Sequence, residues 1–257
     1  MNVEAEIMSR ETSSAEAQPV AWIAGVGPDR GLGAALARRF ADGGMIAVVS
    51  GRTPARLDAI VEGIRASGGQ AVASPGDLTQ PAFIRETLAR IGALGRLEAA
   101  VFNAGGNRWK PTLDMEDDFF EEVWRLCCFS GFVFGRETAR IMLDRGRGSL
   151  LFTGASASLR GRSQFTAFAA AKAGLRMVSQ SMARELGPLG LHVAHVIVDG
   201  LIDGDRAREV AGGAMESKGP DGTLKPEAIA EAFWQLHLQH RSAWTQELDL
   251  RPFSESF

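Results

Sequence analysis

The stretch VAWIAGVGPDRGLGAALARRF (residues 20–40) joins a short apolar run to a glycine-rich turn and then to an amphipathic segment. VAWIAG (20–25) is apolar along its length and ends at a glycine, which is typical of a buried strand. From Gly31 to Asp42, apolar side chains recur at the spacing of one helical face, at Leu32, Ala35, Leu36 and Phe40. The stretch therefore predicts a strand, a tight turn and a helix in direct succession.

Strand-like and helix-like segments continue to alternate after residue 42. Further strands are expected at 45–50, 70–74, 97–103, 148–153, 192–198 and 245–250, and further helices at 54–67, 81–91, 116–145, 164–186 and 226–239. A glycine-rich irregular segment is expected over 200–224. Apolar strands separated by helices are typical of a parallel sheet covered on both faces. The predicted fold class is α/β, a doubly wound parallel sheet in a three-layer α/β/α sandwich.

The composition is that of a globular protein. With 257 residues, 45% of them hydrophobic, and a net charge of −3, the chain is not wholly disordered, and neither nucleic acid nor a membrane is an expected partner. The two cysteines are adjacent, so no disulfide framework forms and a cytoplasmic location is expected. Residues 1–19 lack the apolar core of a signal peptide and are expected to form a flexible tail. Residues 20–257 then form one domain, in which 201–224 are expected to cover the substrate as a lid.

The turn after the first strand contains Gly27, Gly31 and Gly33. Glycines at such a turn let a pyrophosphate approach the backbone and the N-terminus of the following helix, where free N–H groups favour anions. The pattern predicts a dinucleotide site, because it lies between a first strand and a first helix. The alternative is a plain turn whose glycines serve only to pack the helix.

Two arginines favour NADP over NAD as the cofactor. The second strand ends in Ser50-Gly51-Arg52, without the acid that often holds the ribose 2′-hydroxyl in NAD sites. Arg52, together with Arg30 in the turn, can bind a 2′-phosphate through paired hydrogen bonds. The alternative is that both arginines are solvated surface residues.

Three further motifs occur in order along the chain: Asp77-Leu78, Asn103-Ala104-Gly105, and Lys172 in FAAAK. With the glycine turn, they make residues 20–250 resemble the short-chain dehydrogenase/reductase family. The resemblance implies a Rossmann-type sheet of seven parallel strands, an NAD(P) cofactor, and a homodimer or homotetramer packed through 116–145 and 164–186. The cofactor-binding residues it implies, with those of the turn, are Gly27, Arg30, Gly31, Leu32, Gly33, Arg52, Asp77, Leu78, Asn103, Ala104, Gly105, Lys172, Gly200 and Ile202.

The chain departs from the catalytic pattern of that family at three positions. The family's tyrosine is replaced by Phe168, its serine by Ala155 and its asparagine by Cys127, and the chain contains no tyrosine. Lys172 remains, and Ser156 is the nearest hydroxyl to the serine position. A positioned general acid contributes about 10² to 10⁴ in rate, so an efficient reductase of the usual mechanism is not expected.

Two main functions remain open from the sequence. The first is an NADP(H)-linked oxidoreductase that acts on an unidentified small carbonyl or alcohol substrate, with Lys172 and Ser156 as its catalytic residues. The second is a non-catalytic dinucleotide-binding protein, such as a partner subunit or sensor. A weaker third option is isomerisation or elimination in the same pocket. Arg160 and Arg162 are candidates to hold an anionic substrate or are part of a solvated loop, and the histidine pairs predict no metal site.

Overall fold

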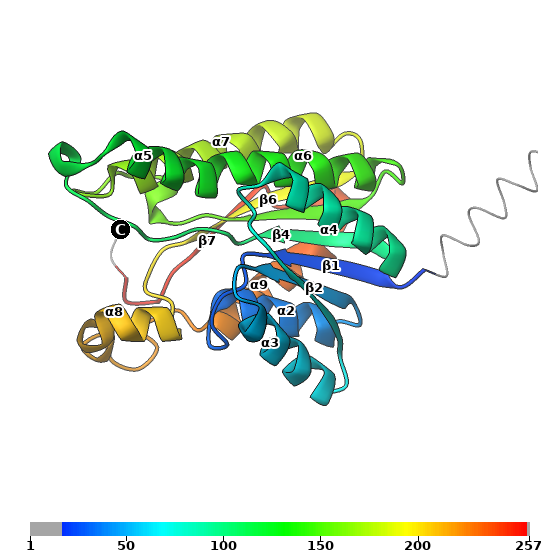
Figure 1. Cartoon of the computed structure of the whole chain (residues 1–257), viewed down its shortest axis with the longest axis horizontal. Helices are drawn as coiled ribbons and strands as arrows, with labels where there is room; N and C mark the ends of the chain where they lie inside the picture. The colour runs from blue at the N-terminus through cyan, green and yellow to red at the C-terminus, as the bar shows by residue number, and fades with distance from the viewer. Residues whose placement is uncertain (1–16, 256–257) are drawn as a thin grey trace, which may run out of the picture.

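The computed structural model describes residues 17–255, which form a sheet of seven parallel strands in the order β3-β2-β1-β4-β5-β6-β7 (Figure 1). This confirms the predicted α/β class and parallel topology. The strands are β1 (Pro19–Ala24), β2 (Ile46–Gly51), β3 (Gln70–Pro75), β4 (Arg96–Phe102), β5 (Gly148–Thr153), β6 (Leu191–Val198) and β7 (Glu247–Leu250). The order reverses between β1 and β4, and ligands in such sheets bind beyond the carboxyl ends at this point.

Helices cover both faces of the sheet (Figure 1). One layer contains α2 (Leu32–Asp42), α3 (Pro54–Ala66) and α9 (Pro226–Leu238). The other contains α4 (Pro81–Leu94), α5 (Asp117–Trp124), α6 (Ser130–Leu143) and α7 (Thr166–Leu186). These elements follow the predicted ranges closely, because their apolar residues recur at strand or helix spacing.

The strand β1 shows how the two cores are separated. Its alternate residues point to opposite faces, as the pleat requires. Ile23 packs into the cluster that contains Phe40 of α2, whereas Trp22 packs into the cluster that contains Phe134 of α6. Trp22 is fully buried and its Nε1 donates a hydrogen bond to Ser50 Oγ at 2.9 Å. The strand β1 is therefore buried on both faces and lies between the two hydrophobic cores.

The helix expected over 116–145 is not regular along its length. Between α5 and α6, residues Arg125–Phe129 form a π-helical turn. The Arg125 carbonyl accepts hydrogen bonds from both the backbone N–H and the hydroxyl of Ser130, the latter at 2.7 Å, as the wider turn allows. Cys127 and Cys128 lie in this turn and are both buried.

The segment 200–224 was expected to be irregular, and this expectation is wrong for its central part. Residues Asp205–Glu216 form helix α8, which has a non-helical backbone at Ala211. Met215 is the one residue of α8 that is buried in the structure, so hydrophobic spacing gave little sign of a helix. Ile202 forms a parallel bridge with Leu224, which joins the two ends of the segment 201–224.

The expected tail over residues 1–19 is too long at its C-terminal end. Pro19 belongs to β1 and lies opposite Arg96, and the Gln18 carbonyl accepts a hydrogen bond of 2.8 Å from Arg96 N. Residues 1–16 lie outside the described part of the chain. Within that part, no helix combines the length and the apolar character that crossing a membrane requires.

Candidate dinucleotide-binding site

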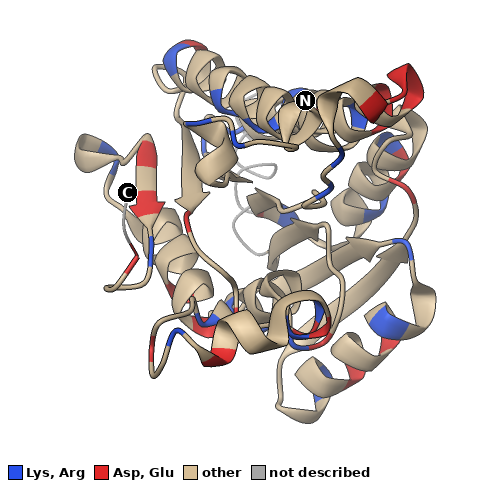
Figure 2. Ribbon diagram, turned by 90° about the vertical axis from the view of Figure 1, so that its left-hand side faces the viewer, with Lys and Arg blue, Asp and Glu red and all other residues tan. Residues whose placement is uncertain are grey.

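The residues predicted to bind a cofactor gather at the carboxyl edge of the sheet, onto which Figure 2 looks. They follow successive strands, except for Lys172, which lies on α7. The residues are Gly27, Arg30, Gly31, Leu32 and Gly33 after β1, Arg52 after β2, Asp77 and Leu78 after β3, Asn103, Ala104 and Gly105 after β4, and Gly200 and Ile202 after β6. Residues that are distant in sequence thus meet at one edge, as the parallel topology requires.

The glycine turn leaves its backbone accessible where a phosphate is expected. A methyl group placed on Gly27 would meet no heavy atom within 4 Å. A methyl group on Gly33 would instead lie 2.8 Å from Val26 Cα, so this glycine lets α2 pack closely against the end of β1. No side chain caps the N-terminus of α2. The open backbone and uncapped N–H groups fit a dinucleotide diphosphate.

Asn103 joins the ends of the two central strands. Its Nδ2 donates a hydrogen bond of 3.0 Å to the Gly25 carbonyl, and its backbone N–H donates one of 2.7 Å to the Ala24 carbonyl. These hydrogen bonds hold the backbone at the ends of β1 and β4 in a fixed place, and this backbone forms the floor of the crevice. Ala104 and Leu78 are also buried.

Lys172 is a buried charged residue at this edge, with 4% of its surface exposed. Its Nζ donates a hydrogen bond of 2.8 Å to the Thr153 carbonyl and would lie 3.2 Å from a methyl group placed on Gly105. Burial lowers the pKa of this ammonium. Thr153 Oγ1 is also buried and has no hydrogen-bond partner within residues 17–255. Unpartnered polar atoms beside a buried ammonium fit a polar ligand.

Lys172 lies close to Phe168 and Cys127, two residues that the sequence singles out. The Phe168 ring centroid lies 6.0 Å from Lys172 Nζ, and Cys127 Sγ would lie 3.8 Å from the same methyl group on Gly105. Ser156 is half-buried, and its hydroxyl has no hydrogen bond to the described chain. The structure therefore brings Lys172, Phe168 and Cys127 together.

A buried polar chain supports the loop after β5, and the sequence gave no sign of it. Ser158 Oγ lies 3.4 Å from His195 Nε2, and His195 Nδ1 lies 3.2 Å from Glu247 Oε2. Arg176 donates to both carboxylate oxygens of Glu247, at 2.6 and 2.7 Å. Burial lowers the pKa of His195 to about 4, so the ring is neutral near pH 7. The neutral ring donates from Nδ1 to Glu247 and accepts at Nε2 from Ser158.

The other candidates are placed as follows. Arg160, a candidate for an anionic substrate, forms an ion pair of 2.9 Å with the buried Asp199. His192 Nε2 lies 2.9 Å from the Thr245 carbonyl, and His237 Nδ1 lies 2.9 Å from Ser149 Oγ. Within residues 17–255, no group of three or more His, Cys, Asp or Glu side chains is placed to hold a metal ion.

The comparison with family models decides the classification of the chain. The model described as short chain dehydrogenase matches residues 20–211. The chain belongs to the short-chain dehydrogenase family. Members of this family are NAD(P)-dependent oxidoreductases.

Individual short-chain dehydrogenases agree with this classification. The short-chain reductase protein NovJ of Streptomyces niveus is 31% identical over 226 residues, which cover 83% of this chain and 84% of NovJ. A short-chain dehydrogenase from Rhodopseudomonas palustris has a similar structure, with 42% identity, a TM-score of 0.79, and coverage of 92% of this chain and 99% of that one. A metagenomic short-chain oxidoreductase solved in complex with NADP shares the fold, with 24% identity, a TM-score of 0.76, and coverage of 93% and 98%.

Proposed function

We propose that the chain is an NADP(H)-dependent oxidoreductase of a small carbonyl or alcohol substrate, in which Lys172 replaces the missing tyrosine as the source of the proton. The observation that carries this proposal is the buried Lys172 ammonium at the carboxyl edge of the sheet. The bound dinucleotide would supply or accept a hydride. The remaining chemistry depends on the residues of the chain.

Lys172 has the geometry to hold and release a proton. An ammonium group has three N–H donors, and the structure gives one of them a hydrogen bond, to the Thr153 carbonyl. The others are available to ribose hydroxyls and to the oxygen of the substrate. Burial lowers the pKa of Lys172, which favours release of a proton as an alcohol forms. We propose that the Ser156 hydroxyl orients the same substrate oxygen.

The cofactor is proposed to lie across the crevice between the ends of β1 and β4. Gly27, Gly31, Leu32 and Gly33 would bind the diphosphate, Asp77, Leu78 and the stretch 103–105 the adenosine, and Lys172, Gly200 and Ile202 the nicotinamide half. Arg30 and Arg52 are exposed, and neither has an ion pair among the described residues. Their free guanidinium groups support NADP over NAD, because a 2′-phosphate would pair with them.

The alternative is a protein of the same fold that binds the dinucleotide without catalysis. It is favoured by Phe168, Ala155 and Cys127, because these side chains stand where the resemblance places the family's tyrosine, serine and asparagine. Isomerisation or elimination in the same pocket is a third possibility, and it would leave the cofactor's redox state unchanged.

The test compares the wild type, Lys172→Ala, and the double variant Phe168→Tyr with Ala155→Ser. NADPH oxidation is followed with small aldehydes, ketones and 3-oxo esters. The proposal predicts turnover in the wild type, its loss in Lys172→Ala, and an increase of about 10² to 10⁴ in the double variant. NADPH binding without wild-type turnover would favour the alternative, and product without NADPH oxidation would indicate non-redox chemistry.

We also propose that the chain forms homodimers or homotetramers through the layer of α5, α6 and α7. Large apolar side chains are partly exposed there. They are Phe120 and Trp124 of α5, Phe132 and Ile141 of α6, and Met177 of α7, with 37–48% of their surfaces exposed. Light scattering of the purified chain would show a dimer or tetramer, and a monomer at micromolar concentration would contradict this assembly.

A further inference from the structure

The lid helix α8 is attached to the glycine turn at its first residue. Asp205 N donates a hydrogen bond of 2.9 Å to the Arg30 carbonyl, and Arg30 N donates one of 3.2 Å to Asp205 Oδ2. The residue before α8, Gly204, lies against the same place, because a methyl group on it would overlap the Arg30 carbonyl oxygen. The start of the lid is therefore fixed on the loop that follows β1.

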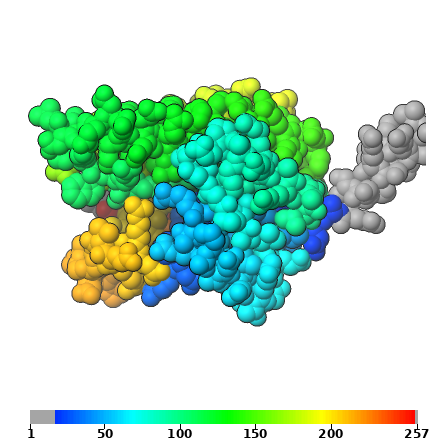
Figure 3. Space-filling view, in the orientation of Figure 1, coloured from blue at the N-terminus to red at the C-terminus, as the bar shows by residue number. Residues whose placement is uncertain are grey.

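Arg206, the next residue, reaches the opposite wall of the crevice. Its two terminal nitrogens would lie 3.8 and 3.9 Å from a methyl group placed on Gly106, which follows β4. The first turn of α8 thus touches the loops that follow β1 and β4, the two strands between which the sheet order reverses. Figure 3 shows the lid, in gold, facing the green helical layer across a recess at this edge.

The charge of Arg206 has no partner in the described chain, whereas that of its neighbour does. Arg208, two residues further along the same helix, is paired with Asp203 at 2.5 Å. Arg206 is exposed and forms no ion pair within residues 17–255. An unpaired guanidinium held over a crevice that offers bare backbone N–H groups is placed to bind an anion.

We propose that Arg206 is a cofactor-binding residue that closes the lid over the dinucleotide diphosphate. The proposal rests on the proposed function, because it takes the ligand of the crevice to be a nicotinamide dinucleotide. The contact between Asp205 and Arg30 is the anchor that holds Arg206 above the glycine turn, where the diphosphate would lie. The lid and the turn then bind the same anionic group from opposite sides.

The test measures the dissociation constants of NADPH and of 2′-AMP for the full-length chain by calorimetry. Arg206→Gln removes the charge, with Arg208→Gln as its control. Gly204→Ala keeps every charge but places a methyl group against the Arg30 carbonyl, with Gly213→Ala as its control, because a methyl group there meets nothing within 4 Å. The ligand 2′-AMP contains the 2′-phosphate but lacks the diphosphate.

Arg206→Gln and Gly204→Ala should each weaken NADPH binding about tenfold, which is the effect of about 1.4 kcal/mol. Both control variants should stay within twofold of the wild type. Binding of 2′-AMP should be unchanged in all four variants. Wild-type affinity for NADPH in Arg206→Gln would overturn the inference, as would an equal loss of NADPH and 2′-AMP binding.

Failure of the proposed function gives a different result. A wild-type chain that binds 2′-AMP and NADPH equally weakly, or neither of them, would overturn the dinucleotide site itself and the role of Arg206 with it. Tight NADPH binding by the wild type and by Arg206→Gln alike would overturn only the role of Arg206.

Discussion

Arginines gather at both edges of the sheet, but they are paired in different ways. At the amino edge, Arg145 and Arg147 lie 2.6 and 3.3 Å from the carboxylate of Glu98, which is buried and also pairs with Arg96. At the carboxyl edge, the structure gives Arg30, Arg52 and Arg206 no ion pair within residues 17–255. Arginines that pair with a buried carboxylate are held in the fold, whereas unpaired arginines at a crevice are available to a ligand.

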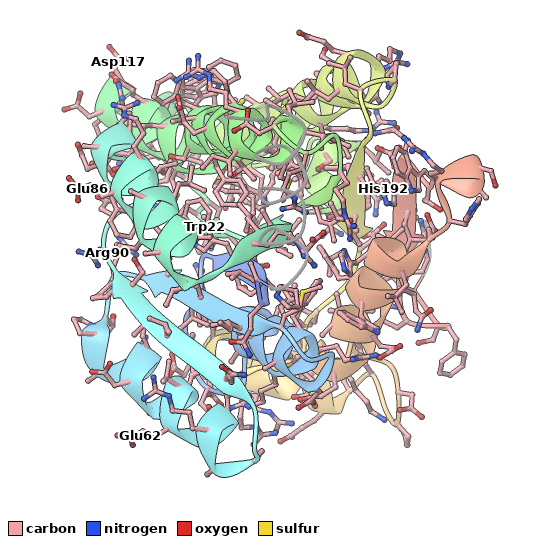
Figure 4. All side chains as sticks on the ribbon, turned by 90° about the vertical axis from the view of Figure 1, so that its right-hand side faces the viewer. Trp22, Glu62, Glu86, Arg90, Asp117 and His192 are labelled. Carbon is pink, nitrogen blue, oxygen red and sulfur yellow. The ribbon has the colours of Figure 1, made fainter. Side chains whose placement is uncertain are left out.

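The amino edge also contains a hollow of about 240 Å³, which is lined by Glu98, Arg147, His192 and His237 among others. Figure 4 looks at this side of the molecule and labels His192. The His192 ring stacks on Trp244 with centroids 5.0 Å apart. Glu98 and its arginines hold one another at this edge, whereas Arg30, Arg52 and Arg206 at the carboxyl edge form no ion pair within residues 17–255, so these two groups of arginines should respond differently to substitution.

The largest effect is expected from Lys172→Ala at the carboxyl edge. Turnover with NADPH should fall at least about 100-fold, because the proposed proton donor is lost. The free energy of unfolding should change by less than about 2 kcal/mol, because the loss of buried methylenes and of the hydrogen bond to Thr153 opposes the removal of a buried charge whose pKa burial lowers. Steady-state kinetics and urea unfolding measure the two quantities. The exposed Lys225 provides the control as Lys225→Ala, and full activity in Lys172→Ala would refute its catalytic role.

At the amino edge, Glu98→Gln should affect stability instead of binding. The free energy of unfolding should fall by about 3 kcal/mol, because the change leaves Arg145 and its neighbours without their buried carboxylate. The NADPH dissociation constant should stay within twofold of the wild type. The control is Glu122→Gln, which breaks an exposed pair with Arg108 and should cost less than about 1 kcal/mol. A large loss of NADPH affinity in Glu98→Gln would remove the distinction between the edges.

The chain through His195 predicts loss of stability in acid. Burial lowers the pKa of folded His195 to about 4, whereas an unfolded imidazole takes up a proton below about pH 6.5. The unfolded chain binds more protons in this range, so stability falls as the pH drops from about 6.5 to about 4. His195 should account for about 2 kcal/mol of the loss between pH 7.5 and pH 5.

Urea unfolding at these two pH values tests the prediction. His195→Gln should reduce the difference between the two free energies of unfolding by that amount, whereas the exposed His240→Gln should not. An unchanged difference in His195→Gln would mean that the folded chain protonates His195 as readily as the unfolded chain does.

The smallest effect concerns the choice between NADP and NAD. Combined Arg30→Gln and Arg52→Gln should weaken NADPH binding about tenfold and leave NADH binding within twofold, because only NADPH carries the 2′-phosphate. Fluorescence titrations with both nucleotides measure this, with Arg184→Gln near the end of α7 as the control. An equal loss for both nucleotides would show that these arginines do not read the phosphate.

The parts of the molecule that the sequence predicted depend on local patterns. The strand residues 20–24 and the turn with Gly27 and Gly33 are recognised from apolar runs and glycine spacing, and they lie where expected. Their order along the chain also fixes the edge at which Asn103 meets the turn, because parallel strands share a carboxyl edge.

The parts that it missed depend on contacts between distant residues. Helix α8 buries little apolar surface and is attached through Asp205 to Arg30, 175 residues away. The partners of His195 are Ser158 and Glu247, 37 and 52 residues away. No spacing rule connects such positions. Acids stand at helical spacing on both sides of Arg206, at Asp203 and Glu209, so the sequence alone does not indicate that this guanidinium is unpaired.

Calorimetric titration of the unaltered chain with NADPH and with NADH shows whether the carboxyl edge is a dinucleotide site. The carboxyl-edge site predicts saturable NADPH binding with a dissociation constant below about 100 µM, and weaker binding of NADH. Absence of saturable binding of either nucleotide up to about 1 mM would contradict the claim that this edge is a dinucleotide site.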